Sequence, residues 1–183
     1  MICAPKRIPE MFRRARDIKT LLLDVDGVLT PGQIVHSEGG DMLKFFNALD
    51  GFGIKLARFA GLRIGIISAS ESDAIRHRAS DLKVEVLYLG RYDKLNAYES
   101  LKQELRISDG EIAFVGDDIP DLPVLRKVGF PVAVHNASQP VKETAGFVTR
   151  RGGGQGAVRE VIDFILHAQG RLEEMVEAIQ AHL

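Results

Sequence analysis

Six short apolar runs recur along the chain, and amphipathic segments separate most of them. The runs cover residues 20–25, 63–67, 84–89, 112–115 and 131–134, with a short last one at 146–149. Between them, apolar residues recur at helical spacing, as in the set Leu95, Tyr98, Leu101 and Leu105. Strands that alternate with helices in this way form a parallel sheet covered on both faces. We therefore expect an α/β fold.

Two segments depart from this alternation. Residues 33–46 place a Gly-Gly pair between short apolar stretches, which predicts a β-hairpin flap beside the sheet. A C-terminal helical tail at about 157–183 follows the glycine-rich residues 151–156 and carries two apolar stripes that break near Gly170. The second stripe could pack on the core or on a neighbouring subunit. With no linker or repeat, residues 1–183 are expected to form one domain.

Charge and composition limit the partners. Lys and Arg number 24 against 25 Asp and Glu, so we expect neither nucleic acid nor a membrane as a partner. No apolar stretch could span a bilayer or serve as a secretion signal, and the single Cys3 agrees with a reducing compartment. We therefore expect a soluble, cytoplasmic protein. The basic N-terminal segment is interpreted as a solvated first helix, not a transit peptide; its basic residues are Lys6, Arg7, Arg13, Arg14 and Arg16.

Acidic side chains, a hydroxyl and a lysine follow the ends of successive apolar runs. In order along the chain they are Asp24 and Asp26, Ser68, Lys94, and Asp117 with Asp118 and Asp121. Ligands of such sheets bind outside the carboxyl ends of the strands, where these groups would meet. Singly, each has a simpler explanation: a solvated strand end, an exposed lysine or a helix N-terminus. Their shared position favours a phosphoryl-transfer site.

The chemistry follows from Asp24, which comes directly after the apolar Leu21–Leu23. A half-buried carboxylate is costly unless a cation offsets it, and a divalent ion shared with Asp117 would do so. Oxygen ligands without His or Cys favour Mg²⁺. Asp24 is then the expected nucleophile, Asp26 the general acid and base, and Lys94 a positive charge on the phosphoryl oxygens. None of the five histidines shares this edge, and none is expected to be catalytic.

These motifs resemble those of a known family. "DVDGVLT", Ser68, Lys94 and "GDDIPD" are similar to the four ordered motifs of the haloacid dehalogenase superfamily. "FNALDGFGIK", "YLGRYDK" and "GGGQGAVREV" resemble, more narrowly, the 3-deoxy-D-manno-octulosonate 8-phosphate phosphatases, which make a lipopolysaccharide precursor. The resemblance implies a three-layer Rossmann-like sheet with the flap and no large cap domain.

The resemblance also implies a ligand set and an assembly. Mg²⁺ would be held by the side chains of Asp24 and Asp117 and by the backbone carbonyl of Asp26. A homotetramer is implied, in which a neighbour's C-terminal segment helps to close the site. The phosphorylated sugar acid would contact Lys94 and the residues at five family positions, namely Asn47, Asp50, Gly51, Lys55 and Arg78. Helix capping by Asn47 or Asp50, and plain exposure of Lys55 and Arg78, are the alternatives.

One motif departs from the family. Thr-Gly-Arg is usual where this chain has Ser68-Ala69-Ser70. Ser68 keeps a hydroxyl for a phosphoryl oxygen, and Ser70 or Ser72 could cap the next helix. Ser70 replaces an anion-binding arginine, and we hypothesise that Arg91 supplies some of the missing charge; the alternative is that Arg91 is a solvated loop arginine.

The expected function is Mg²⁺-dependent hydrolysis of 3-deoxy-D-manno-octulosonate 8-phosphate through an aspartyl-phosphate. Because Ser70 replaces an arginine, a nine-carbon sugar-acid phosphate is an alternative substrate. A non-catalytic binding or assembly domain is an alternative of another class, although Asp24, Asp26, Lys94 and Asp117 are all present.

Overall fold

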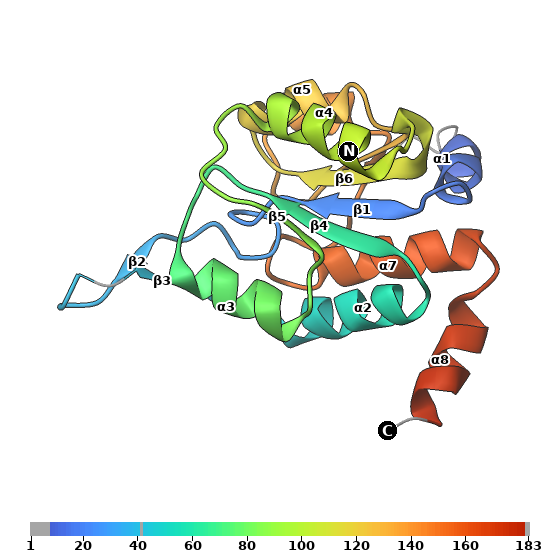
Figure 1. Ribbon diagram of the computed structural model, residues 1–183, viewed down its shortest axis with the longest axis horizontal. Coiled ribbons are helices and arrows are strands. Elements are labelled where there is room, and N and C mark those ends of the chain that lie inside the picture. Colours follow the sequence, from blue (N-terminus) through green and yellow to red (C-terminus); the bar gives the residue numbers. More distant parts are fainter. Residues whose placement is uncertain (1–7, 41, 182–183) are drawn as a thin grey trace.

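The computed structural model describes residues 8–40 and 42–181 and contains a six-stranded parallel sheet (Figure 1). The strand order is β5-β4-β1-β6-β7-β8. The strands are β1 (Thr20–Leu23), β4 (Arg63–Ile67), β5 (Val86–Tyr88), β6 (Ile112–Gly116), β7 (Phe130–Ala133) and β8 (Phe147–Val148). The predicted α/β fold is confirmed.

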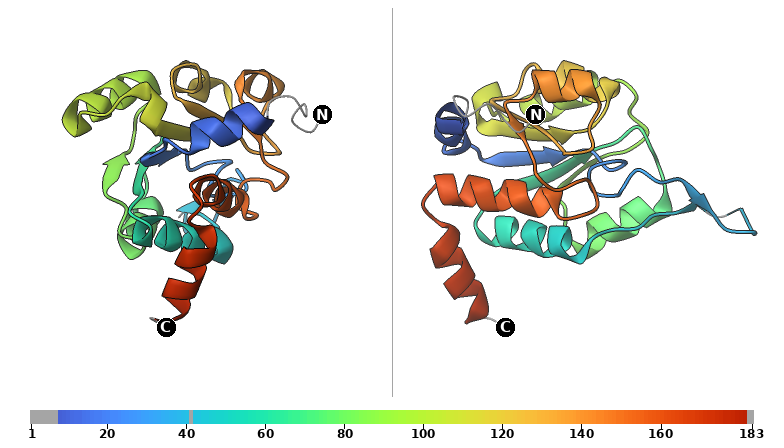
Figure 2. Two further views of the ribbon diagram at one scale, coloured as in Figure 1. Left: turned by 90° about the vertical axis from the view of Figure 1, so that its right-hand side faces the viewer. Right: turned by 180° about the vertical axis from the view of Figure 1, so that it is seen from behind.

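Helices cover both faces of the sheet (Figures 1 and 2). One layer holds α2 (Ala48–Phe59), α3 (Asp73–Asp81) and α7 (Ala157–Ala168), with α2 packed on α7. The other holds α4 (Lys94–Leu105), α5 (Leu122–Leu125) and α6 (Gln139–Thr144). Two 3-10 turns, η1 (Asp109–Glu111) and η2 (Ile119–Asp121), precede β6 and α5. The sheet is thus the middle of three layers, as the family resemblance implies.

The first strand is fully buried and ends two residues earlier than predicted. The carbonyl of Val25 accepts hydrogen bonds from the amides of Val28, Leu29 and Thr30, at 3.2, 2.9 and 3.0 Å. A carbonyl used in a turn in this way cannot continue the sheet ladder, so the backbone leaves the sheet at Asp24. The predicted range of β1 was therefore too long, because the apolar Val25 belongs to the turn.

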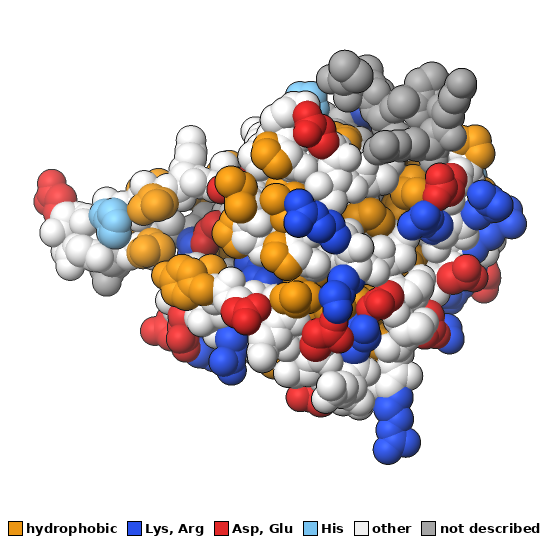
Figure 3. Space-filling model, turned by 90° about the horizontal axis from the view of Figure 1, so that it is seen from above, with side chains coloured by type: hydrophobic (Ala, Val, Ile, Leu, Met, Phe, Trp, Pro, Cys, Tyr) orange, Lys and Arg blue, Asp and Glu red, His pale blue; other side chains and the backbone are white. Residues whose placement is uncertain are grey.

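The predicted flap is present as an antiparallel pair of β2 (Val35–His36) and β3 (Met42–Leu43). Only two residues of each strand pair, so the sheet portion is shorter than the predicted segment 33–46. The hairpin projects beyond the body of the molecule (Figure 1), and hydrophobic side chains lie on it and near its base (Figure 3). Its exposed apolar residues are Ile34, Met42, Leu43 and Phe45.

The terminal helices differ in how much they bury. In α1 (Ile8–Ala15), Met11 and Ala15 are buried while Arg13 and Arg14 are exposed, as expected for a solvated first helix. Cys3, Lys6 and Arg7 lie outside the described residues. The apolar stripe of α7 is buried, so the first C-terminal stripe packs on the core. In α8 (Leu172–Gln180), which follows Gly170, only Met175 among the described side chains is buried. No helix within the described part of the chain is long and apolar enough to cross a bilayer.

Candidate active site

Three neighbouring strands carry the predicted site residues to one edge of the sheet. β1, β4 and β6 lead into Asp24, Ser68 and Asp117, and β1 lies between the other two. From β1 the chain continues to β4 on one side and later returns to β6 on the other, so this is the switch point where such sheets bind ligands. Carboxylate oxygens of Asp24, Asp117 and Asp121 lie within 4.8 Å of one another.

Lys94 is buried beside this carboxylate cluster. It is the first residue of α4, whose N-terminus is capped by Asp93 through a 3.1 Å bond from the Asn96 amide. The Lys94 Nζ lies 2.9 Å from Asp24 Oδ1 and 2.6 Å from Asp121 Oδ1. Burial alone would lower the pKa of Lys94, but the two ion pairs outweigh it and the pKa is raised. Lys94 is therefore a cation fixed against the predicted nucleophile.

Asp121 orders the loop that carries Asp117. Its Oδ2 accepts hydrogen bonds from the amides of Asp117 at 2.8 Å and Asp118 at 3.3 Å, while its Oδ1 binds Lys94. The side chain of Asp118 is exposed. Asp121 thus connects the lysine to the Asp117 loop.

The buried carboxylates are electrostatically suited to a metal ion. Burial raises the pKa of Asp24 to about 6, and burial together with the charges of Asp24 and Asp121 raises the pKa of Asp117 to about 8. Lys94 is one cation among three carboxylates of the cluster. A divalent cation would favour the ionised forms, and an all-oxygen donor set suits Mg²⁺.

A glycine makes room for Asp117. Gly27 has a φ of +89°, and a Cβ added to it would lie 2.0 Å from Asp117 Oδ2. A side chain at this position would therefore be strained by the backbone and would displace the carboxylate. The "DVDG" motif needs its glycine for both reasons.

Asp26 contacts the flap and is not one of the grouped carboxylates. Its Oδ1 lies 2.5 Å from the Nζ of Lys44, which sits just after β3 and has a side chain only 5% exposed. Thr30 Oγ1 lies 3.5 Å from the same carboxylate oxygen. Lys44 was not predicted at the site, because nothing in the local sequence distinguishes it from an ordinary solvent-exposed lysine. The contact depends on how the flap folds back.

Ser68 lies at the end of β4 and is buried. Its Oγ accepts a 3.1 Å hydrogen bond from the Ser70 amide, and its carbonyl accepts one from the Arg91 amide at 2.9 Å. The N-cap of α3 is Ser72, whose hydroxyl accepts from the Ile75 amide at 3.4 Å. Of the two serines considered for capping, Ser72 therefore has that role, and the backbone holds Arg91 next to Ser68.

The predicted substrate residues around the start of α2 have partners within the chain. Asn47 caps α2 and donates to the carbonyl of Gly154 at 3.0 Å. The buried carboxylate of Asp50 accepts from the amides of Gly156 at 3.2 Å and Arg159 at 2.9 Å, and burial raises its pKa.

The remaining predicted substrate residues lie around the same helix. Arg78 donates to the Asn47 carbonyl at 3.3 Å, stacks on Phe46 and lies where a Cβ on Gly51 would fall. Lys55 is exposed on α2. The structure thus brings Asn47, Asp50, Gly51 and Arg78 together, while Lys55 lies farther along the helix.

The glycine-rich segment before α7 packs directly against the "DVDG" loop. The Gly154 amide donates to the Val28 carbonyl at 2.9 Å, and a Cβ on Gly153 would lie 1.7 Å from the carbonyl oxygen of Gly27. The sequence identified this segment as the start of the tail and as a motif shared with the family, but did not predict its contact with the "DVDG" loop. Its three consecutive glycines were the available signal for a close backbone approach.

The comparisons with known proteins agree with this geometry. A family model for haloacid dehalogenase-like hydrolases matches residues 70–162. The 3-deoxy-D-manno-octulosonate 8-phosphate phosphatase KdsC of Escherichia coli K12 is 42% identical over 90% of this chain and 88% of its own length.

Solved structures are similar over nearly the whole chain. The Moraxella catarrhalis 3-deoxy-D-manno-octulosonate 8-phosphate phosphatase in complex with magnesium ion, phosphate ion and KDO has a TM-score of 0.91 and 34% identity, covering 93% of this chain and 98% of that one. The cobalt-bound deoxy-D-mannose-octulosonate 8-phosphate phosphatase of Haemophilus influenzae has a TM-score of 0.84 and 36% identity, covering 87% and 93%. The chain therefore belongs to the 3-deoxy-D-manno-octulosonate 8-phosphate phosphatase family of haloacid dehalogenase-like hydrolases.

Proposed function

We propose that the protein hydrolyses 3-deoxy-D-manno-octulosonate 8-phosphate to the free sugar acid and phosphate in a Mg²⁺-dependent reaction. One observation carries the proposal: the buried Asp24 carboxylate is held by Lys94 next to Asp117, at the sheet's switch point. The family to which the chain belongs supports the choice of substrate. Relatives with magnesium and with cobalt bound support a divalent metal at this site.

Each side chain of the site has a separate role in the reaction. Asp24 attacks phosphorus and forms an aspartyl-phosphate, while Asp26 gives a proton to the leaving alcohol and then takes one from the attacking water. Lys94 offsets negative charge on the nucleophile and on the phosphoryl oxygens. Asp24, Asp117 and the Asp26 carbonyl would hold the metal, and its positive charge would keep these carboxylates ionised.

The phosphoryl group is bound at the end of β4. Ser68 presents its hydroxyl there, and the backbone bond between Ser68 and Arg91 keeps the arginine at the same loop. We assign Arg91 some of the anion binding that the family's usual arginine provides at the position of Ser70. Its side chain is exposed and free to turn toward a bound anion.

The sugar acid binds on the side of the site formed by α2, α3 and the flap. Asn47, Asp50, Gly51, Lys55 and Arg78 form that side. The contacts of Asn47 and Asp50 with the 154–159 segment support a role in shaping the sugar site, since these residues place the glycine-rich loop. The absence of a guanidinium at Ser70 favours a second candidate substrate, a nine-carbon sugar-acid phosphate.

The active form is a homotetramer in the cytoplasm. The flap exposes Ile34, Met42, Leu43 and Phe45, with exposed fractions from 43% to 77%, and such an apolar surface on a two-stranded hairpin favours burial against other subunits. Because the flap is short, it covers only part of the active site, and a neighbour's C-terminal segment covers the rest. The sedimentation coefficient tests the tetramer, and an Ile34→Lys/Phe45→Lys variant would dissociate it.

A panel of phosphosugars tests the reaction and the substrate together. Wild type should release phosphate from the eight-carbon substrate only with Mg²⁺, and Asp24→Asn should reduce the rate by about 10³-fold or more. Asp81→Asn, at an exposed carboxylate at the end of α3 and outside the carboxylate cluster, is the matched control and should keep most activity. Equal rates for wild type and Asp24→Asn would exclude the mechanism, and faster turnover of a nine-carbon substrate would exclude the primary substrate.

A further inference from the structure

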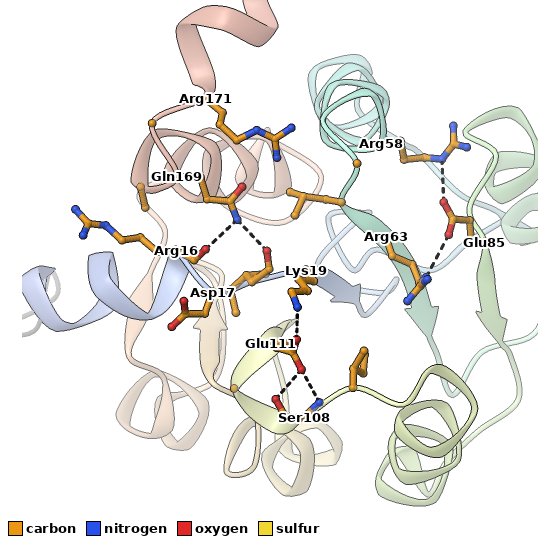
Figure 4. A pocket seen from close by; sticks show the side chains of 17 residues that line it. Arg16, Asp17, Lys19, Arg58, Arg63, Glu85, Ser108, Glu111, Gln169 and Arg171 are labelled. Carbon is orange, nitrogen blue, oxygen red and sulfur yellow. Dashed lines mark hydrogen bonds and ion pairs between the residues drawn. The ribbon is translucent and has the colours of Figure 1, made fainter.

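A cavity lies at the edge of the sheet opposite the catalytic carboxylates. Its volume is about 1220 Å³, and it is bounded by the α1–β1 turn, the end of α2, the start of η1 and the turn between α7 and α8 (Figure 4). Lys19 lines it and immediately precedes β1, whose other end leads into Asp24. Four residues of strand separate the two sites, about 13 Å of chain.

The lining of this cavity is cationic in a chain of net charge −1. The lining contains three carboxylates, Asp17, Glu85 and Glu111. It contains five cationic side chains, which are Arg16, Lys19, Arg58, Arg63 and Arg171. Small-molecule pockets are typically roughly 300–1,000 Å³, so size permits a ligand as large as a nucleotide. The local charge excess favours an anionic ligand.

The arginines of the cavity are incompletely paired. Arg58 and Arg63 share Glu85, at 3.9 and 3.4 Å from their Nε atoms, and the buried Arg58 Nε has no hydrogen-bond partner in the described structure. Arg171 donates to the Ala60 carbonyl at 2.6 Å, and the described ion pairs give it no carboxylate. Part of its role is to neutralise the C-terminal end of α2, but a guanidinium has further donors for an anion.

Apolar groups complete the lining between the charged side chains. Figure 4 shows Arg171 and Gln169 projecting from the α7–α8 turn and Arg58 and Arg63 from the segment around the end of α2. Ile107 contributes partly exposed apolar surface, whereas Leu62 is only 4% exposed. Guanidinium groups bind phosphates in a bidentate manner and stack on planar rings, so charge and apolar surface together suit a ligand with both parts.

We propose that this cavity is a second ligand site that binds a small phosphorylated metabolite with an apolar or planar body. It is separate from the active site, and its residues take no part in the proposed hydrolysis. The phosphoryl group would lie by Arg63 and Arg171, since Lys19 is paired with Glu111 at 2.6 Å, and the body would lie against the partly exposed Ile107.

Hydrogen–deuterium exchange of the Mg²⁺-loaded full-length protein tests where anions bind. The probes are adenosine diphosphate, inorganic pyrophosphate and adenosine. The diphosphate should protect peptides around Lys19, Arg63 and Gly170 in a saturable manner, pyrophosphate more weakly and adenosine least. Protection confined to the active-site loops at residues 24–30 and 68–72, or no saturable protection, would overturn the proposal.

Two double variants with the same change in charge distinguish a specific binding site from general electrostatic attraction. Arg63→Gln/Arg171→Gln should weaken adenosine diphosphate binding by about tenfold in calorimetry, whereas Arg13→Gln/Arg126→Gln, equal in charge change and outside the cavity, should change it by less than about twofold. Because Arg171 also holds Ala60, Arg63→Gln alone must weaken binding by about threefold. Equal losses in both double variants would contradict the site.

Discussion

The ammonium group of Lys44 lies 2.5 Å from the Asp26 carboxylate, so the base of the flap is tied to the residue proposed to move the proton. The Lys44 side chain is 5% exposed, while that of Asp26 is 41% exposed. The lysine is therefore enclosed, and the carboxylate keeps an open side toward substrate and water. This ion pair joins the position of the flap to the orientation of the general acid and base.

Replacing Lys44 should impair catalysis more than stability. Lys44→Met removes the pair, and we expect a fall in kcat/KM of about tenfold, with about 1 kcal/mol lost from the free energy of unfolding because solvent screens the exposed Asp26. Lys44→Arg should recover part of the activity, and limited proteolysis should cleave the flap of Lys44→Met faster. Unchanged kinetics and unchanged proteolysis would show that the pair has no role in holding the flap.

The stability of the metal-free protein should fall as pH rises from about 4 to 8. The folded-state pKa values of Asp24 and Asp117 are raised, to about 6 and about 8, so the folded protein holds protons that the unfolded chain releases. The stability from these protonated carboxyls is present below about pH 4 and is lost as pH rises through the folded pKa values. Mg²⁺ should reverse this trend, because it binds the ionised carboxylates.

Melting temperatures with chelator and with Mg²⁺ at several pH values check this prediction. The increase in Tm caused by Mg²⁺ should grow from pH 5 to pH 8, and Asp117→Asn should flatten the dependence. A constant increase across this range would be incompatible with carboxylates that must ionise to bind the metal.

Gly27→Ala should damage the metal site through Asp117. The added Cβ would meet Asp117 Oδ2 at a φ of +89°, so we expect about 1–3 kcal/mol of destabilisation together with weaker Mg²⁺ binding. Gly40→Ala is a matched control, since its φ is +86° and no atom of the described residues beyond its chain neighbours lies within 4 Å of its Cβ position. Mg²⁺ titrations followed by Tm should separate the two variants, and equal Mg²⁺ affinity in both would refute the steric argument.

Arg91→Ala should raise the KM for the sugar-acid phosphate by about tenfold, the effect of one charge-assisted hydrogen bond. Its kcat should change less, since the arginine binds the anion and does not move a proton. Arg126→Ala, at the exposed arginine that follows the C-terminus of α5, is the control. An unchanged KM for every sugar-acid phosphate tested would show that Arg91 does not bind the substrate.

Asp50→Ala should destabilise the fold by about 1–3 kcal/mol, because the amides of Gly156 and Arg159 would lose their buried acceptor. Chemical denaturation measures this loss. If Asp50 also binds substrate, KM should rise further than in Asn47→Ala, which disturbs the same glycine-rich loop from its other side. A fully stable Asp50→Ala would contradict the structural role.

Sequence patterns predicted the strands and the chemistry because both are local. Apolar runs mark buried strands wherever they occur, and the residue that follows each run lies at the same sheet edge in a parallel fold. Asp24, Ser68 and Asp117 could therefore be assigned to one site without knowing the order of the strands. The turn at Val25 was missed, because an apolar residue fits a strand and a buried turn equally well.

The sequence by itself determined the α/β class and predicted which acids, hydroxyl and lysine gather at the candidate site. Only the tertiary structure decided which groups support them, because those contacts join residues far apart in the chain. Asp50 meets Gly156 across 106 residues, and Lys44 meets Asp26 only when the flap folds back. Periodicity reports which face of an element is buried, whereas the partner across the interface depends on how the whole chain packs.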